Sequence, residues 1–333
     1  MKKFILFLSI IVLSCTEGRV FDDDSVDFAS LHVETPVVLS QFTSGSVLLL
    51  TIGTTLSAFA DDSESRFPIV ENVTIENLGT GMIKDLYPCS DKPSQFIADI
   101  DLEEGEAFKI SLAFPEISKK QVKAIDTIPF SSDILSITLI PEAKKVDNSL
   151  LTLVRLLIKP SSFQKVSNYE ISVSTQITDS LDVYGFPLES SMKAPSLRYL
   201  HAEDPLITRE VNYPSLLQLD AFPPQKLYFS KVQEYGSFEI EFYYTPPDFS
   251  IADISTGEST YKVYSHTSTI YLRTISEVYY KYQTSRLNQF YSRKGDPIYG
   301  VGEPVSVFSN IENGVGIFAA FVTDSIKVDY TNK

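Results

Sequence analysis

The sequence has no tryptophan and only three histidines among its 333 residues. Tryptophan offers the largest aromatic platform for binding sugars at a surface, so its absence disfavours a dedicated glycan-binding module. The histidines, His32, His201 and His266, are far apart and show neither an HExxH pattern nor paired metal-ligand spacing. We therefore expect no metal site.

The sequence also lacks the signatures of common catalytic sites. No GxSxG nucleophile elbow and no GxxxxGK[ST] phosphate loop occurs. The 43 acidic residues permit many pairs of carboxylates in space, so acid–base catalysis stays open as a third hypothesis about function. Our prediction is a protein that is not an enzyme and carries no cofactor.

Basic residues are scarce as well. The chain has 28 lysines and arginines against 43 acidic residues, a formal net charge of −15. Such an acidic surface repels phosphate backbones, which excludes nucleic acid as an expected partner. Adsorption to anionic lipid needs basic clusters, so any attachment to a membrane must come from an apolar segment or from acyl chains.

The N-terminus has the layout of a bacterial lipoprotein signal peptide. Lys2 and Lys3 precede the short apolar run Phe4–Leu13, and the small residue Ser14 then precedes Cys15. An uncleaved anchor helix is the alternative, but this run is too short for a hydrocarbon core that needs ~20 residues. We expect residues 1–14 to be removed and Cys15 to carry a diacylglycerol, although Leu13 is bulkier than the usual residue of this motif.

Cys89 is the second of only two cysteines. With Cys15 lipidated, Cys89 has no partner for an intramolecular disulfide, so the fold must depend on its core. Its Tyr-Pro-Cys-Ser-Asp setting resembles a turn, which favours a half-buried small residue over a reactive or metal-binding thiol.

Residues 15–32 form an acidic tether in our interpretation. The cluster Asp22, Asp23 and Asp24 is either a solvated linker or a signal for export to the cell surface, and both interpretations stay open. Thr16 follows the cysteine where aspartate would favour retention at the inner membrane. We expect a lipid-anchored protein of the outer membrane that faces the cell surface.

From residue 33 the pattern is β throughout. Short runs of Val, Ile, Leu, Thr and Phe, such as Phe108–Phe114, alternate with turn residues. Residues 33–128 predict an immunoglobulin-like β-sandwich, and residues 129–333 predict a larger antiparallel β domain. Within the second part, Leu150–Ile158 is apolar on both faces and predicts a central strand, whereas residues 179–215 predict long loops.

One helix is predicted near residues 276–294. Ser276 can cap its N-terminus, and Glu277 suits the positive end of the helix dipole. Its aromatic stripe, which includes Tyr279, Tyr282 and Phe290, favours packing against the sheet over a ligand-stacking platform.

The C-terminal motifs resemble the family catalogued as domain of unknown function 4249. The motifs that carry this resemblance are Ser276–Tyr282, Gly295-Asp296-Pro297, Glu303-Pro304-Val305 and Ser309–Phe318. The N-terminal half is similar in layout, through Val70–Ile75, Glu104–Ile110 and Val122–Pro129. Within the last motif, Asn313-Gly314 can form a turn, Gly314 and Gly316 allow positive φ or close backbone approach, and the segments 305–309 and 315–322 predict paired strands.

The resemblance implies a Bacteroidota-type outer-membrane lipoprotein, typically encoded beside a TonB-dependent receptor. The leading hypothesis is therefore a non-enzymatic, surface-exposed accessory or substrate-capture subunit of a TonB-dependent transporter. The alternative is a structural or assembly subunit of an outer-membrane complex with no small ligand.

Overall fold

The computed structural model describes residues 33–55, 68–146, 149–183, 186–192, 195–208, 225–232, 236–246, 259–293 and 306–331. These residues form three β-sheets and two helices. A ten-stranded long sheet contains β1 (Pro36–Thr43), β2 (Leu48–Thr54), β5 (Tyr87–Cys89), β6 (Lys92–Ala98), β11 (Val166–Val183), β12 (Phe186–Met192), β13 (Ser196–Leu197), β15 (Lys226–Val232), β17 (Ser259–Ile275) and β18 (Val315–Thr331).

Two four-stranded sheets complete the β structure. The first small sheet consists of β3 (Glu71–Asn77), β4 (Ile83–Asp85), β7 (Ala107–Phe114) and β8 (Ser118–Thr127). The second small sheet consists of β9 (Asp133–Val146), β10 (Ser149–Lys159), β14 (Leu200–His201) and β16 (Phe238–Tyr244). The helices are α2 (Pro205–Thr208) and α4 (Glu277–Arg293). The prediction of a mainly β protein with mostly antiparallel sheets is confirmed.

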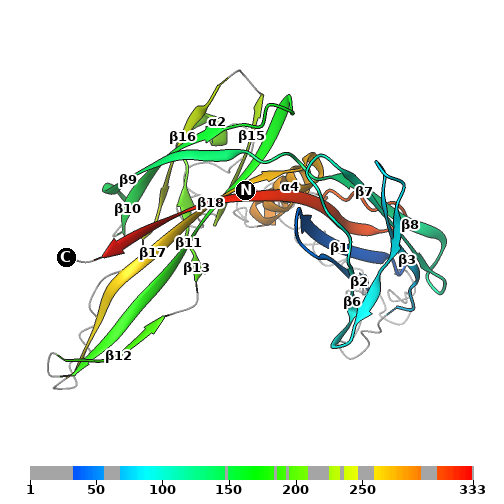
Figure 1. Cartoon of the computed structure of the whole chain (residues 1–333), viewed down its shortest axis with the longest axis horizontal. Coiled ribbons are helices and arrows are strands. Elements are labelled where there is room, and N and C mark those ends of the chain that lie inside the picture. Colours follow the sequence, from blue (N-terminus) through cyan, green and yellow to red (C-terminus); the bar gives the residue numbers. More distant parts are fainter. Residues whose placement is uncertain are drawn as a thin grey trace, which may run out of the picture.

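Strand β18 joins the two ends of the long sheet and crosses the middle of the molecule (Figure 1). It pairs parallel with β1 through Val315–Phe321 and antiparallel with β17 through Phe321–Thr331. Successive side chains of a strand point to opposite faces, so β18 contributes to both sides of the sheet. Its even-numbered residues pack into two apolar cores, and odd-numbered residues face helix α4.

The first core lies between the long sheet and the first small sheet. Phe42, Leu48, Phe108 and Phe318 are fully buried in it, with the rings of Phe42 and Phe318 stacked at 4.5 Å. Inward-facing residues of two sheets interlock in this way in a β-sandwich. Because Phe318 belongs to β18, the C-terminal strand completes a core whose other strands lie before residue 128.

The second core lies between the other end of the long sheet and the second small sheet. Tyr169, Ile171 and Val173 of β11 face Val154 and Phe242 of the small sheet in this core. Strand β10 lies between β9 and β16, which confirms the prediction of a central strand at Leu150–Ile158.

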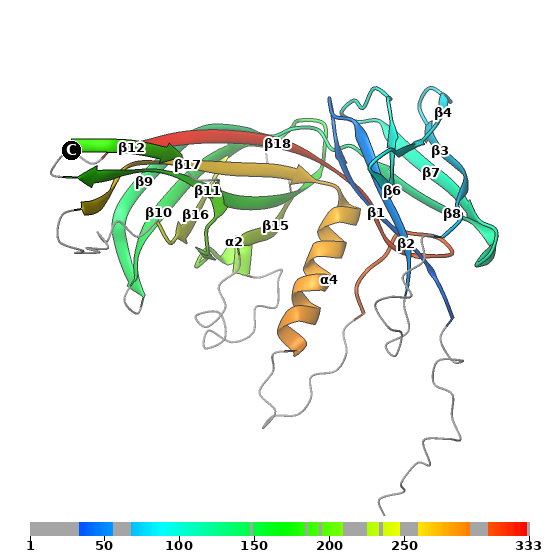
Figure 2. The same cartoon turned by 90° about the horizontal axis from the view of Figure 1, so that it is seen from below.

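Helix α4 packs on the opposite side of the long sheet from both small sheets. Figure 2 shows it projecting from the end of β17, away from the sheet. Ser276 Oγ accepts a hydrogen bond of 3.1 Å from the backbone N–H of Tyr279, the N-cap geometry predicted from the sequence. Tyr279 and Tyr282 pack against the sheet as expected, whereas Phe290 is half-exposed near the far end.

Two sequence predictions are wrong. Residues 179–192 were expected to be loop, but β11 continues to Val183 and pairs with β12 as a long hairpin. Segments 305–309 and 315–322 were expected to pair; instead residues 306–310 are not in a strand and β18 pairs with β1 and β17. The apolar residues of 315–322 predicted this strand correctly, but the segment expected to pair with it was wrong.

The geometry of the turn that leads into β18 requires glycine at positions 314 and 316. Asn313 has a φ of 59°, and Gly316 has a φ of 120°, both in the left-handed half of the map. A Cβ on Gly316 would lie 2.0 Å from the carbonyl oxygen of Val38, and one on Gly314 would lie 2.9 Å from that of Pro36. Both glycines are therefore required where β18 approaches β1 closely.

In the part of the chain described above, no helix is both long and apolar enough to span a bilayer.

Candidate functional site

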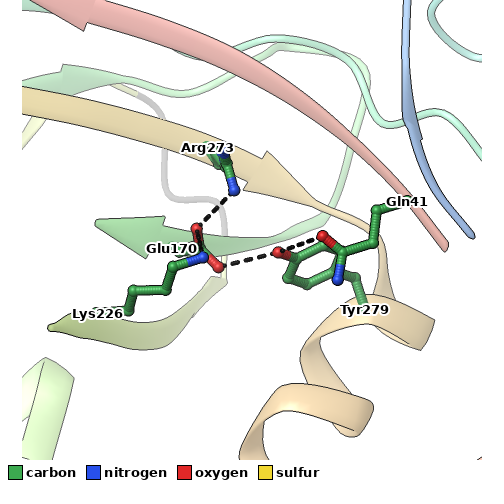
Figure 3. Close-up of polar contacts among 5 residues, drawn as sticks. All are labelled: Gln41, Glu170, Lys226, Arg273 and Tyr279. Carbon is green, nitrogen blue, oxygen red and sulfur yellow. Dashed lines mark hydrogen bonds and ion pairs between the residues drawn. The ribbon is translucent and has the colours of Figure 1, made fainter. Parts of the chain in front are cut away.

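The side of the long sheet that carries α4 holds a buried cluster of charged and phenolic groups (Figure 3). Glu170 of β11 lies at its centre with a fully buried side chain. Its Oε1 accepts hydrogen bonds of 2.9 Å from Lys226 Nζ of β15 and from Arg273 Nη1 of β17. The three strands are neighbours, and their register places Glu170 opposite both Arg273 and Tyr228.

Helix α4 covers this cluster through Tyr279. The hydroxyl of Tyr279 donates to Oε2 of Glu170 at 3.1 Å and lies 3.5 Å from Oε1 of Gln41 on β1. Burial, together with the nearby negative charge of Glu170, raises the pKa of the Tyr279 and Tyr228 hydroxyls, so both stay protonated and act as donors. Through the neutral phenol of Tyr279, helix α4 is thus connected to β1 near the start of the described chain and to Glu170 of β11 in its middle.

A second buried acid holds the first turn of α4. Asp126 is at the end of β8, and its Oδ2 accepts hydrogen bonds from Ser276 Oγ at 2.5 Å and from the backbone N–H of Ala320 at 2.7 Å. Burial raises the pKa of Asp126 to about 6, and these hydrogen bonds only partly oppose that rise. The negative charge of Glu277 raises this pKa further. Asp126 therefore titrates in a range where an exposed aspartate is fully ionised.

A cavity of about 770 Å³ opens beside Asp126. It lies where β8, β11, β15 and the start of α4 meet, and both polar and apolar side chains line it. Asn168, Ser230 and Ser276 are among its polar residues, and Val166 and Val278 are among its apolar ones. A concave site of this size with a few convergent polar groups and an acid of perturbed pKa has the properties of a small-molecule site.

The two buried acids of this arrangement make their contacts with other groups of the protein. In the described part of the chain no group of His, Cys, Asp and Glu side chains is placed to hold a metal ion. Asp126 uses its Oδ2 in contacts with Ser276 and Ala320, and Glu170 uses both oxygens in contacts within the protein. These acids position α4 and the walls of the cavity.

The residues singled out in the sequence fall in several places. Cys15 and the cluster Asp22, Asp23 and Asp24 lie outside the described residues, as does His32. Cys89 is half-buried at the end of β5 and forms no disulfide. His201 lies on β14 and His266 on β17, in different sheets.

Sequence reasoning missed Glu170, Asp126 and the cavity beside Asp126. Glu170 alternates with the apolar residues Tyr169 and Ile171, a pattern that predicts a solvent-facing acid. Nothing nearby indicates that a helix more than one hundred positions later covers it. Asp126 lies in Val122–Pro129, the segment that resembles the inter-domain passage of the family. This position was the one signal in the sequence that Asp126 could join the two β regions of the chain.

Comparison with known proteins agrees with the resemblance. No curated protein matches the chain. The family model described as Domain of unknown function (DUF4249) matches residues 25–327, which include every strand and helix described above except the last four residues of β18. The chain therefore belongs to the DUF4249 family.

Proposed function

We propose that the protein is a non-enzymatic, lipid-anchored protein of the outer-membrane surface that captures or gates a nutrient as the accessory subunit of a TonB-dependent transporter. The cavity beside Asp126 is the observation that carries this proposal. It has room for a small organic molecule, and its walls come from segments far apart in the sequence.

Three further features support the proposal. The signal-peptide pattern that ends at Cys15 supports a lipid anchor, and the acidic cluster after it supports surface export. The resemblance to outer-membrane lipoproteins supports a transporter as partner. The alternative, a structural subunit without a ligand, is supported by the contacts of Glu170, whose two carboxylate oxygens accept bonds from Lys226, Arg273 and Tyr279.

The anchor and the partner are tested together. Cells that produce the tagged full chain are labelled with a fatty acid, and their outer membranes are solubilised and purified through the tag. We expect label on the chain, loss of label and of membrane association in Cys15→Ala, and retention of both in Cys89→Ala. Recovery of the labelled chain without any barrel protein would contradict the role as a transporter subunit.

The cavity is tested by filling it. Ser230→Phe places a ring in the cavity, whereas Ser136→Phe places one at an exposed position of β9 and serves as the control. We expect Ser230→Phe to impair growth on one nutrient and Ser136→Phe to leave growth unchanged. A general envelope defect on every nutrient would instead support the structural alternative.

A further inference from the structure

Polar side chains replace apolar ones at one end of the second core. The residues of β11 that face this core, from Tyr169 to Val173, are followed by Thr175, which is only 1% exposed. Thr175 lies directly opposite Ser268 of β17, and the hydroxyl of Ser268 is 3.3 Å from that of Tyr244 on β16. Ser268 and Tyr244 are fully buried as well. Three hydroxyl groups therefore lie together between the long sheet and the second small sheet.

Arg198 lies at the same end, where the chain crosses from one sheet to the other. Strand β13 pairs with β11 of the long sheet, and the next strand, β14, pairs with β16 of the second small sheet. Arg198 follows β13 directly, and its backbone N–H donates to the carbonyl oxygen of Val173 at 2.8 Å. Ser196 is opposite Thr175, so position 198 falls on the same face of the sheet as Thr175 and Val173. The side chain of Arg198 is thereby directed toward the three hydroxyl groups.

Two buried atoms of this cluster have no hydrogen-bond partner within the described part of the chain. They are Oγ1 of Thr175 and Nε of Arg198. The Nε–H group can only donate. Ser268 and Tyr244 share a single hydrogen bond, so one of these hydroxyls keeps a hydrogen to donate whichever way that bond points. Buried polar atoms in folded proteins are nearly always paired, so these donors suit an acceptor group from another molecule.

The charge of Arg198 is also uncompensated. Arg155 and Arg273 contact acids at 2.6 and 2.9 Å, whereas Arg198 forms no ion pair among the described residues. Burial lowers the pKa of Arg198, and the nearby oxygen of Tyr244 opposes this lowering only in part. Removal of a guanidinium from water without a counter-charge costs free energy, which a bound anion offsets. The acceptor group is therefore expected to be negatively charged.

A carboxylate fits this cluster better than a phosphate. A guanidinium carries a single positive charge and presents N–H groups side by side, which match the single charge and the paired oxygens of a carboxylate. A phosphate monoester carries about two negative charges at neutral pH, and the acidic chain, with its formal charge of −15, repels the second one. The neighbours Leu197 and Tyr199 are 41% and 52% exposed, so the rest of a carboxylate ligand can extend into solvent.

We infer that Arg198, Thr175 and the hydroxyl pair of Ser268 and Tyr244 bind the carboxylate group of a small organic acid. Arg198 supplies the positive charge, and the hydroxyl groups donate hydrogen bonds to the carboxylate oxygens. Different residues line the cavity beside Asp126, so this is a second site. The inference goes beyond the proposed function and depends on neither the lipid anchor nor that cavity.

Saturation-transfer NMR on the full chain in detergent tests this, with acetate, butyrate and benzoate as probes. Arg198→Gln removes the charge of the site and keeps a polar side chain. Arg155→Gln removes the same charge from an exposed ion pair on the second small sheet and serves as the control. We expect binding of the carboxylates to be at least about tenfold weaker in Arg198→Gln and unchanged in Arg155→Gln.

Thr175→Val supplies a second readout that does not depend on the folding of Arg198→Gln. Valine has nearly the shape of threonine and lacks the unpartnered hydroxyl. Without a carboxylate, the urea midpoint should be equal to that of wild type or slightly higher, whereas carboxylate binding should weaken about three- to tenfold. Thr138→Val, at an exposed position of β9, should change neither quantity.

Each other outcome overturns the inference. Absence of binding by all three carboxylates, or equal weakening in Arg155→Gln, would show that the cluster is only a hydrated part of the fold. Tighter binding of inorganic phosphate or sulfate would refute the choice of a carboxylate, and equal displacement by chloride would identify a site for simple ions. Unchanged binding in Thr175→Val would remove that residue from the site. The fatty-acid label and the Ser230→Phe phenotype test the proposed function separately.

Discussion

The most direct test of the structure is the replacement of Asp126 by asparagine. The carboxylate is buried, and its pKa of about 6 lies well above the ordinary aspartate value of 3.8. Asparagine has nearly the same shape and keeps a carbonyl oxygen that can accept from Ser276 Oγ and the N–H of Ala320. Asparagine differs from aspartate mainly because its side chain never ionises.

The sign of the effect follows from the direction of the shift. The folded protein binds the Asp126 proton more tightly than the unfolded chain does, so this group's contribution to stability is fully present below about pH 4. That contribution is lost as the pH rises through about 6. A shift of about two pKa units corresponds to about 3 kcal/mol. Part of this contribution is already lost below pH 4.5, so wild type should lose about 2 kcal/mol relative to Asp126→Asn between pH 4.5 and pH 7.5.

Urea unfolding of the lipid-free chain, followed by circular dichroism at pH 4.5, 6 and 7.5, measures this difference. We expect Asp126→Asn to become progressively more stable than wild type as the pH rises. Asp99→Asn, an exposed aspartate changed in the same way, should follow wild type at every pH. A constant difference between Asp126→Asn and wild type across the three pH values would refute the reasoning, because only a titrating carboxylate produces the slope.

Three other substitutions give sharp expectations, each measured by urea or thermal unfolding. Gly316→Ala should destabilise by at least about 2 kcal/mol, because its φ and the nearby Val38 carbonyl both exclude a Cβ, whereas Gly53→Ala, with open space around it, should have little effect. Glu170→Gln should cost about 3–5 kcal/mol, because it leaves two partly buried cations without a counter-charge. Tyr279→Phe should cost about 1 kcal/mol through the lost hydrogen bond, and an unchanged midpoint would contradict the contact with Glu170.

Local patterns in the sequence predicted the local structure well. Alternation and turn residues identified strands such as β7 and β10, because each strand buries its own apolar residues whatever its neighbour is. The capping residue Ser276 located the start of α4 because it bonds to Tyr279, only three positions further along the chain.

The pairing of distant segments could not be predicted in the same way. The register of β18 on β1 depends on contacts between opposite ends of the chain, which leave no periodic trace in either segment. Residues 179–192 look like loop because they are mostly polar and include Pro187. They form strands because β17 pairs with β11 up to Val183 and β11 in turn pairs with β12. Glu170 is buried because α4 covers it, and no pattern in the sequence around Glu170 indicates this.

The position of β18 also dictates the order in which the molecule can fold. Strand β1 precedes all the other described strands in the chain, but one of its two neighbours in the sheet is β18, which follows all of them. Until β18 arrives, the first core lacks Phe318 and the two ends of the long sheet are not joined. Pairing of such distant segments is slow. The delay keeps β1 without one of its two sheet neighbours until β18 has been made, so the finished sheet cannot form while the chain is still being synthesised.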